Sequence, residues 1–308
     1  MVRFGERIAS VLEYVGVRST HYYHSGERIS FSPSDPLAFY LDSSPRASYS
    51  GPYDPRGIPL YTSKGKTDYL PVLICAWALG HVELYRQTKR DEHRARFISA
   101  CEWLLANLDS AGVWLVNHPM PKFDLHRPFP SAIVQGVGLS CLCRAVWLTG
   151  DDRYLRAATA ALAPFRKTAD NGGIMTRTDG YVFYEEYPSV PHRHVLNGFI
   201  LSLWGLFDLI RLNDHAEAKH LYEDGLRTLV AWLPRFDLGH WSLYHVGGDL
   251  KNPATVHYHR LHIAQLRIMH LVTGLSVFSE YAERWQAYSS RRWNALRTFP
   301  AKLRWTLS

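Results

Sequence analysis

The feature that most constrains the fold of this chain is a repeat of helical hairpins with a period of ~62 residues. From Asp68 onward, apolar residues recur with helical spacing in eight segments: 68–87, 91–108, 131–149, 152–165, 192–213, 215–233, 255–273 and 276–299. The odd-numbered segments begin 63, 61 and 63 residues apart, and the even-numbered ones, which begin near Asp91, Asp152, Asp214 and Ser276, are 61, 62 and 62 residues apart. Each repeat is therefore two helices and a long loop, which predicts a mainly α-helical protein.

The two helices of a repeat differ in composition. The first is mostly apolar on all sides, as in residues 200–207, whereas the second is amphipathic and charged, as in residues 217–224. A helix that is apolar all round is buried, and an amphipathic helix covers it from outside. Four such pairs predict an incomplete (α/α) toroid, with a plain α-solenoid as the competing arrangement.

The residues before the repeat have a different character. Residues 1–16 read as an amphipathic helix, and alternating stretches at 28–31 and 37–40 predict a small β-hairpin region without a core of its own. We therefore expect three parts: the N-terminal helix and β-hairpin region over 1–62, the toroid over 63–290, and a basic C-terminal tail over 291–308.

The net charge of +7 is concentrated at the C-terminal end. Six Lys and Arg residues and no acid lie between Arg284 and the end of the chain, so the remainder is close to neutral. This distribution does not favour nucleic acid as a partner. In the tail, Trp293, Leu296, Phe299 and Leu303 alternate with basic residues, which resembles an interfacial membrane helix. An outer helix that caps the toroid is the alternative.

The cysteines and the apolar runs bear on metals and location. Cys75, Cys101, Cys141 and Cys143 fall within apolar helical patterns without zinc-ligand spacing, so we expect buried free thiols and no metal. The apolar runs are interrupted too early to span a bilayer, and no signal peptide is seen. A cytoplasmic or membrane-peripheral location is favoured.

Three long loops lead into inner helices: 114–130, 171–191 and 236–253. Each loop is aromatic and polar, and long loops of defined composition in a compact domain are usually functional. Because each precedes an inner helix, all three should emerge at the same end of the toroid. That end is the predicted mouth of a cleft.

The second loop contains Tyr184-Glu185-Glu186-Tyr187-Pro188, a dense set of proton-transfer groups. Adjacent side chains point in different directions, so at most one of Glu185 and Glu186 is expected to face a given substrate. A surface acid pair flanked by packing tyrosines is the alternative.

The fourth inner helix opens with a group of histidines. Its residues His259 and His262 are three apart, so they could share a helix face. A metal would need a third ligand that is not evident, and structural histidines at a helix start are commoner.

The loop motif belongs to a wider set of stretches that covers roughly residues 57 to 288. The set comprises Gly57-Ile-Pro-Leu60, Tyr69 with Pro71, Ser131-Ala132 with Gln135-Gly136, Tyr184–Pro188, Val195–Phe199, Gly205–Leu209, Leu233-Pro234 with Asp237, Tyr244, Tyr258-His259, His262-Ile263 and Gln265-Leu266. In this combination the chain resembles the D-glucuronyl C5-epimerases, which act on heparan-type polysaccharides.

The resemblance implies conversion of D-glucuronic acid to L-iduronic acid within a heparosan- or heparan-type polymer. The family's catalytic group corresponds here to Glu186, Tyr187, Tyr244 and Tyr258. We expect Glu186 and Tyr258 to act from opposite faces of the sugar, while Tyr187 and Tyr244 hydrogen-bond its carboxylate. Glutamate and tyrosine supply this chemistry without a cofactor, and the resemblance also implies a homodimer.

Eight further residues are candidates for contact with the anionic polysaccharide. They are Lys64, Lys66, Tyr69, Gln135, Arg177, Asn197, His259 and His262. The chain also departs from the family: His257 stands where an acid is usual, Arg260 replaces a small polar residue, and the basic residue that usually follows Tyr244 is missing. These departures concern substrate detail, such as tolerance of sulfate or acetyl groups.

Three other functions compete with epimerisation. A polysaccharide lyase shares the removal of the C5 proton and then expels the C4 oxygen. A glycoside hydrolase needs two carboxylates roughly 5–9 Å apart across the scissile bond, which adjacent glutamates do not provide by themselves. A glycan-binding protein without activity is a different class, and the filled catalytic positions argue against it.

Overall fold

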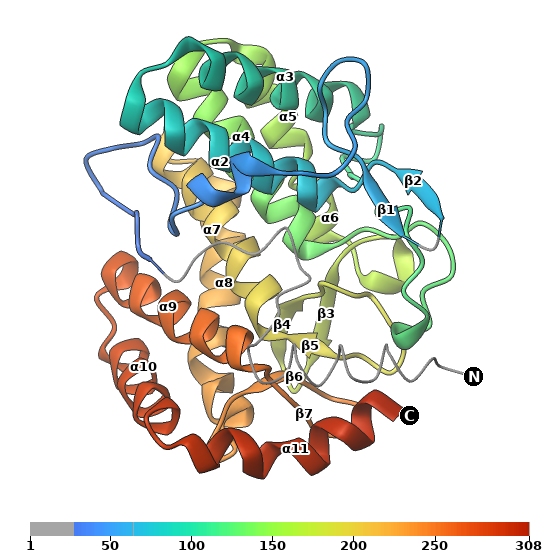
Figure 1. The fold of residues 1–308 in the computed structure, drawn as a ribbon, viewed down its shortest axis with the longest axis vertical. Coiled ribbons are helices and arrows are strands. Elements are labelled where there is room, and N and C mark those ends of the chain that lie inside the picture. Colours follow the sequence, from blue (N-terminus) through green and yellow to red (C-terminus); the bar gives the residue numbers. More distant parts are fainter. Residues whose placement is uncertain (1–27, 64, 308) are drawn as a thin grey trace.

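The computed structural model describes residues 28–63 and 65–307, which form a mainly helical fold (Figure 1). Its helices are α2 (Pro71–Thr88), α3 (Asp91–Asn107), α4 (Ala132–Thr149), α5 (Asp152–Ala160), α6 (Ala163–Arg166), α7 (Leu196–Asn213), α8 (Ala216–Trp232), α9 (Val256–Thr273), α10 (Ser276–Ser289) and α11 (Arg292–Leu307). Its strands are β1 (Tyr61–Ser63), β2 (Lys66–Asp68), β3 (Met175–Thr178), β4 (Tyr181–Tyr184), β5 (His194–Val195), β6 (Leu243–Val246) and β7 (Asn252–Pro253). The helix predicted over residues 1–16 lies outside the described residues.

All eight predicted helical segments are present, with three differences at their ends. Pro164 separates α5 from α6, because in a continuous helix its ring would clash with the carbonyl four residues earlier. α10 and α11 divide the last segment, and α11 continues to Leu307. α7 begins later than predicted, because His194 and Val195 pair with β6 as a strand.

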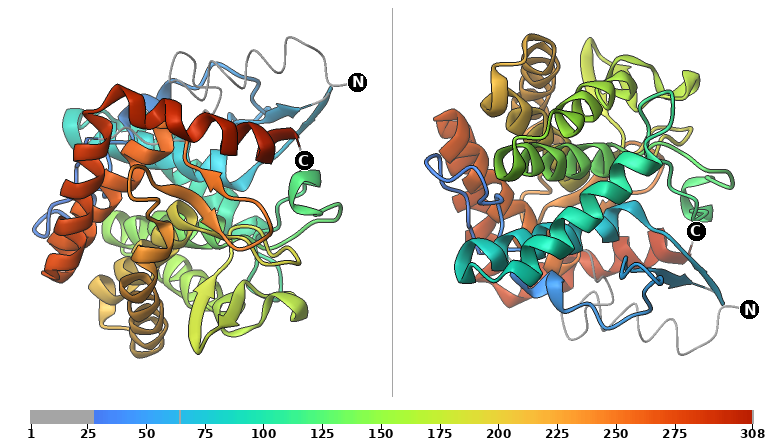
Figure 2. Two further views of the ribbon diagram at one scale, coloured as in Figure 1. Left: turned by 90° about the horizontal axis from the view of Figure 1, so that it is seen from below. Right: turned by 90° about the horizontal axis from the view of Figure 1, so that it is seen from above.

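The helices form an inner and an outer layer (Figure 2). α2, α4, α7 and α9 pack side by side in that order, and each has an outer helix against it: α3, α5, α8 and α10. α4 and α7 approach most closely, since a Cβ on Gly205 would lie 2.2 Å from the carbonyl oxygen of Gly136. Only glycine allows this approach, which brings the first turns of the two helices to one end of the fold.

α4 is a strongly apolar inner helix. Among the described residues it is the one helix long and apolar enough to cross a membrane by length and composition, and 72% of that stretch is buried inside the fold. It packs between α2 and α7, as expected of a core helix.

The segment around Tyr40 is anchored in the helical core by a buried ion pair. Arg144 of α4 and Asp208 of α7 lie 2.6 Å apart, and both side chains are fully buried. The Tyr40 hydroxyl donates to Asp208 at 3.0 Å, and Arg144 donates to the carbonyls of Leu37 and Ala38. The large buried side chains of residues 28–62 are thus part of the same core as the helices.

The stretches predicted as strands at 28–31 and 37–40 do not form regular strands. They pair antiparallel at a single bridge, between Ile29 and Leu41, with backbone hydrogen bonds between 28–31 and 40–42 on either side of it. Arg144 binds the carbonyls of Leu37 and Ala38, which a longer strand pairing would otherwise use. The hairpin of this region lies further on, where β1 and β2 pair antiparallel, and the predicted boundary at residue 62 falls inside β1.

Candidate active site

Glu185 and Glu186 point to opposite sides of the loop that follows β4, as the sequence predicts. The Glu185 carboxylate is fully buried and accepts hydrogen bonds from the Thr176 hydroxyl and from Nδ1 of His194, both at 2.6 Å. The backbone carbonyls of both glutamates bond to the start of α4, one to the Ala132 amide and the other to the Ser131 hydroxyl. Glu185 is thus a structural residue.

Glu186 faces the start of α7 instead. A Cβ on Gly198, in the first turn of α7, would lie 2.2 Å from Oε2 of Glu186, so the carboxylate occupies the space that glycine leaves. The N-terminus of a helix carries a partial positive charge that favours an anion. Glu186 is only 5% exposed, and the Tyr244 hydroxyl donates to its Oε1 at 3.4 Å.

The four residues of the predicted catalytic group lie together, although they come from three parts of the chain. Tyr244 is on β6, and its ring lies edge-on to that of Tyr258 with centroids 4.7 Å apart. Tyr258 is fixed in the first turn of α9, where its amide donates to the Thr255 hydroxyl. Tyr187 stacks on Phe123 at 4.0 Å. Tyr187 and Tyr258 both pack against the small cluster that contains Tyr244, so one carboxylate and three phenols lie close together.

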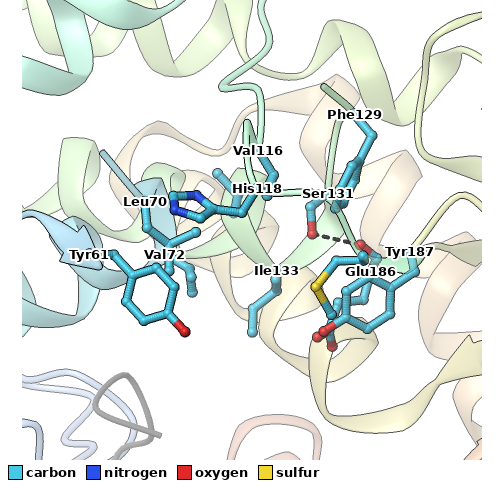
Figure 3. A pocket seen from close by; sticks show the side chains of 12 residues that line it. Tyr61, Leu70, Val72, Val116, His118, Phe129, Ser131, Ile133, Glu186 and Tyr187 are labelled. Carbon is cyan, nitrogen blue, oxygen red and sulfur yellow. Dashed lines mark hydrogen bonds between the residues drawn. The ribbon is translucent and has the colours of Figure 1, made fainter. Parts of the chain in front are cut away.

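A cavity of about 100 Å³ opens beside this group (Figure 3). Tyr61 and His118 line one side of it, with their rings 5.1 Å apart, and Glu186 and Tyr187 line the other. Ile133, from the first turn of α4, lies between the two sides.

Tyr61 and His118 were not predicted as site residues. Burial lowers the pKa of His118, and neither ring nitrogen has a hydrogen-bond partner among the described residues. The loop over 114–130 was assigned to the mouth, but nothing in its sequence distinguishes His118 from its neighbours. Tyr61 lies before the first inner helix, in a stretch that is not one of the three long loops.

The substrate contacts predicted before the first inner helix lie at or directly after the β1–β2 hairpin. Lys64 is outside the described residues. Lys66 is exposed and pairs with Asp68 at 3.1 Å. The Tyr69 hydroxyl donates to Asp54 at 2.7 Å, which fixes it within the N-terminal region.

Gln135, Asn197 and Arg177 have three different environments. Gln135 is buried in α4 and is occupied by backbone groups, accepting from the Trp114 amide and donating to the carbonyls of Gly112 and Ala161. Asn197 is buried beside Gly198 at the start of α7, and its side-chain oxygen has no partner among the described residues. Arg177 is exposed on β3, on the face opposite Thr176. Of the three, Asn197 is the one next in the chain to Gly198, which Glu186 contacts.

His259 and His262 share a helix face, as predicted, but both point into the core. Their Nδ1 atoms lie 2.8 and 3.0 Å from the Ser242 hydroxyl, and Trp241 stacks on His259. Burial lowers the pKa of His259 to about 4 and holds the pKa of His262 well below its usual value, so both are neutral at pH 7. Their contacts join the third loop to α9.

The described residues contain no group of three or more His, Cys, Asp or Glu side chains placed to hold a metal ion. The four cysteines are buried free thiols, as predicted, and burial raises the pKa of Cys75, Cys101 and Cys143.

The sequence of the chain is similar to those of known proteins. Residues 108–287, more than half of the chain, match the family model described as D-glucuronyl C5-epimerase C-terminus. The chain belongs to the D-glucuronyl C5-epimerase family. It is 35% identical over 221 residues to a D-glucuronyl C5-epimerase of Caenorhabditis elegans, covering 65% of this chain and 36% of the relative. It is also 32% identical over 178 residues to an uncharacterized protein of Methanocaldococcus jannaschii, covering 56% and 57%. The chain thus spans about a third to just over half of these relatives.

Solved structures resemble this epimerase-family chain only weakly. A family 76 glycoside hydrolase from a bovine Bacteroides thetaiotaomicron strain matches with a TM-score of 0.46 and 14% identity, over 65% of this chain and 43% of the other. A polysaccharide lyase matches with a TM-score of 0.35 and 12% identity, over 94% and 46%. At these TM-scores neither likeness bears on the activity.

Proposed function

We propose that this protein is a uronate C5-epimerase that converts D-glucuronic acid to L-iduronic acid within a heparosan- or heparan-type polysaccharide. One observation carries the proposal: Glu186 is turned away from its buried neighbour and placed against a helix start, with Tyr244 and Tyr258 beside it. The family membership agrees with it.

In the proposed reaction, Glu186 and Tyr258 act from opposite faces of the sugar ring. One removes the C5 proton, and the electron pair of the broken C–H bond moves into the substrate carboxylate to give an enolate. Tyr187 and Tyr244 donate hydrogen bonds to this charge. The other residue then delivers a proton to the opposite face of C5, so that a new C–H bond forms with inverted configuration and nothing is oxidised or reduced.

The test uses unsulfated glucuronic acid–N-acetylglucosamine and glucuronic acid–N-sulfoglucosamine polymers in heavy water. Proton NMR should show loss of the C5 signal together with new iduronate resonances, and the faster polymer identifies the preferred substrate. Exchange without iduronate would reject epimerisation and leave proton removal on one face. A new absorbance from an unsaturated uronate would reveal a lyase, and no change on any uronate polymer would leave a glycan-binding protein.

We also propose that the two helical layers form an incomplete (α/α) toroid and that the protein is a homodimer that touches membranes at their periphery. The outward side of α11 presents Trp293, Leu296 and Leu303, which are 76%, 51% and 40% exposed, next to basic residues. Anionic vesicles should carry the protein upward in a flotation gradient, whereas neutral vesicles should not. The Trp293→Ser variant should not float with either kind of vesicle.

The proposed homodimer is tested separately, by measuring the molar mass with light scattering after size exclusion.

A further inference from the structure

We propose that the inward side of α11 forms an anion-binding subsite next to Tyr244, which holds the acidic group of a sugar neighbouring the reacting uronate. The acidic group is a carboxylate or a sulfo group, and the proposal rests on the epimerase function proposed above. Figure 1 shows α11 running alongside β7, at the edge of the three-stranded sheet that carries Tyr244.

The subsite has an aromatic floor that continues from the catalytic group. Tyr187 stacks on Phe123, whose ring centroid lies 6.4 Å from that of Trp305 on α11. His245 joins the floor, with its ring 5.8 Å from Trp305 and 6.1 Å from Tyr244. Apart from the stack of Tyr187 on Phe123, the rings are tilted or edge-on to one another, and Phe123 and His245 are almost fully buried, so the floor is a packed support for the charged side chains around it.

Three half-buried cations stand around this floor. Nζ of Lys302 lies 5.1 Å from the ring centroid of Trp305 and 6.0 Å from that of Tyr244. Nζ of Lys122 lies 4.7 Å from the Trp305 ring, and the guanidinium of Arg193 lies 5.5 Å from the Phe123 ring. The cations come from α11, from the turn at Pro121–Phe123 and from the segment before β5, so only the folded chain brings them together.

The side chains of the subsite are held in place. Lys302 donates to the side-chain oxygen of Asn252 at 2.7 Å, and Arg193 donates to the backbone carbonyl of Lys122. A charged group that is already positioned loses less side-chain entropy when it binds its ligand. The subsite is therefore preorganised rather than a loose cluster of surface lysines.

The charges of the subsite disfavour one another. Burial and the neighbouring Arg193 lower the pKa of Lys122. Burial, Arg193 and Lys302 lower the pKa of His245 to about 3, which keeps it neutral at pH 7. Like charges that crowd together in a half-buried place are relieved by an anion. After Tyr244, Val246, Gly247 and Gly248 supply no cation, so those available come from other elements.

The test measures binding of an end-labelled glucuronic acid–N-acetylglucosamine polymer by fluorescence anisotropy, beside turnover in the NMR assay. Lys302→Gln and Lys122→Gln should each weaken binding and raise KM about tenfold, with kcat within about twofold and a weaker dependence on salt. Lys302→Arg should restore binding. Arg304→Gln, an exposed position on the same helix, is the matched control and should leave Kd unchanged.

The outcomes separate the two proposals. If the wild type binds the polymer without turning it over and Lys302→Gln weakens binding, the subsite stands and the epimerase function fails. If the wild type turns over normally and Lys302→Gln behaves like Arg304→Gln, the subsite is overturned and the function stands. If Lys302→Gln and Arg304→Gln weaken polymer binding equally, the subsite is also overturned, because the general positive charge of α11 then accounts for binding. Melting temperatures of all variants show whether the fold is kept.

Discussion

Oε2 of Glu186 lies where a side chain on Gly198 would begin, only 2.2 Å from the position of the missing Cβ. Two segments are thereby placed against each other: the loop that carries Glu186, and the first turn of α7, which favours its charge. The absence of a side chain at position 198 is thus part of how Glu186 is positioned.

Gly198→Ala should therefore displace the carboxylate and lower turnover about 100-fold, the effect expected from a misplacement of about 1 Å. The measurement is kcat of the purified variant. The control is Gly225→Ala on α8, where the new Cβ would meet the end of the Leu203 side chain at 2.4 Å. It should cost stability without removing turnover. Full activity in Gly198→Ala would contradict the close contact.

The two adjacent glutamates should separate activity from stability. Glu186→Gln should lower kcat at least 100-fold with little change in melting temperature, because it removes a proton-transfer group. Glu185→Gln should destabilise the protein by about 1.5–3 kcal/mol, because Thr176 and His194 lose a charged acceptor, and the folded fraction should remain active. The opposite pattern would reverse the assignment.

Removing one hydroxyl at Tyr258 tests the second proton-transfer group. Tyr258→Phe should lower kcat 10²- to 10⁴-fold, roughly the contribution of one general acid or base, while the melting temperature stays within a few degrees. Tyr222→Phe is the control, because the buried Tyr222 hydroxyl has no hydrogen-bond partner in the described part of the chain. Wild-type turnover in Tyr258→Phe would remove Tyr258 from the mechanism.

Removing a charge from the buried ion pair between Arg144 and Asp208 should destabilise the protein more than removing one from an exposed ion pair. Asp208→Asn leaves a guanidinium buried opposite a neutral amide, which should cost about 3–5 kcal/mol in urea unfolding. The same change at Asp179, whose pair with Arg235 is 58% and 44% exposed, should cost about 0–1 kcal/mol. Similar losses in both would show that Arg144 reaches water.

Acid should destabilise the fold below pH 6.5. Burial lowers the pKa of His81 to about 3, while an unfolded histidine has a pKa of about 6.5. Between these two pH values the unfolded chain binds one more proton than the folded chain at each such histidine. The free energy of unfolding therefore falls by up to about 1.4 kcal/mol for each pH unit by which the pH is lowered. Urea titrations at pH 7, 6 and 5 measure the slope. His81→Gln should reduce it, and His126→Gln, at an exposed position, should not.

The fold was largely predictable because its strongest signal is local. Apolar periodicity depends on neighbours along the chain, and it located all eight helical segments. The pairing of β5 with β6 depends on residues about fifty positions apart, so the start of α7 was placed too early. For the same reason the strands near Tyr40 were wrong, since Arg144 binds that backbone from a distant helix.

The residues of the candidate site also fall into those that a local motif reveals and those that only the fold brings together. The motif at 184–188 drew attention to Glu185 and Glu186 together, because a dense run of ionisable groups is visible in the sequence, and the resemblance to the epimerase family selected Glu186. Lys302 and Trp305 were assigned to a tail apart from the toroid, because nothing in their own stretch reveals that α11 turns back beside β7. His118 and Tyr61 were missed because their role comes from facing Glu186 across a cavity.

The groups around the cavity and the proposed catalytic tyrosines lie far apart in the chain, from Tyr61 on β1 to Tyr258 on α9. Neither half of the described chain therefore contains the whole set. On the ribosome, a growing chain could carry out the proposed reaction only after nearly all of these residues have emerged, and a single cut before α11 would release Lys302 and Trp305 from the proposed subsite. The proposed activity is therefore expected only of a completely folded chain.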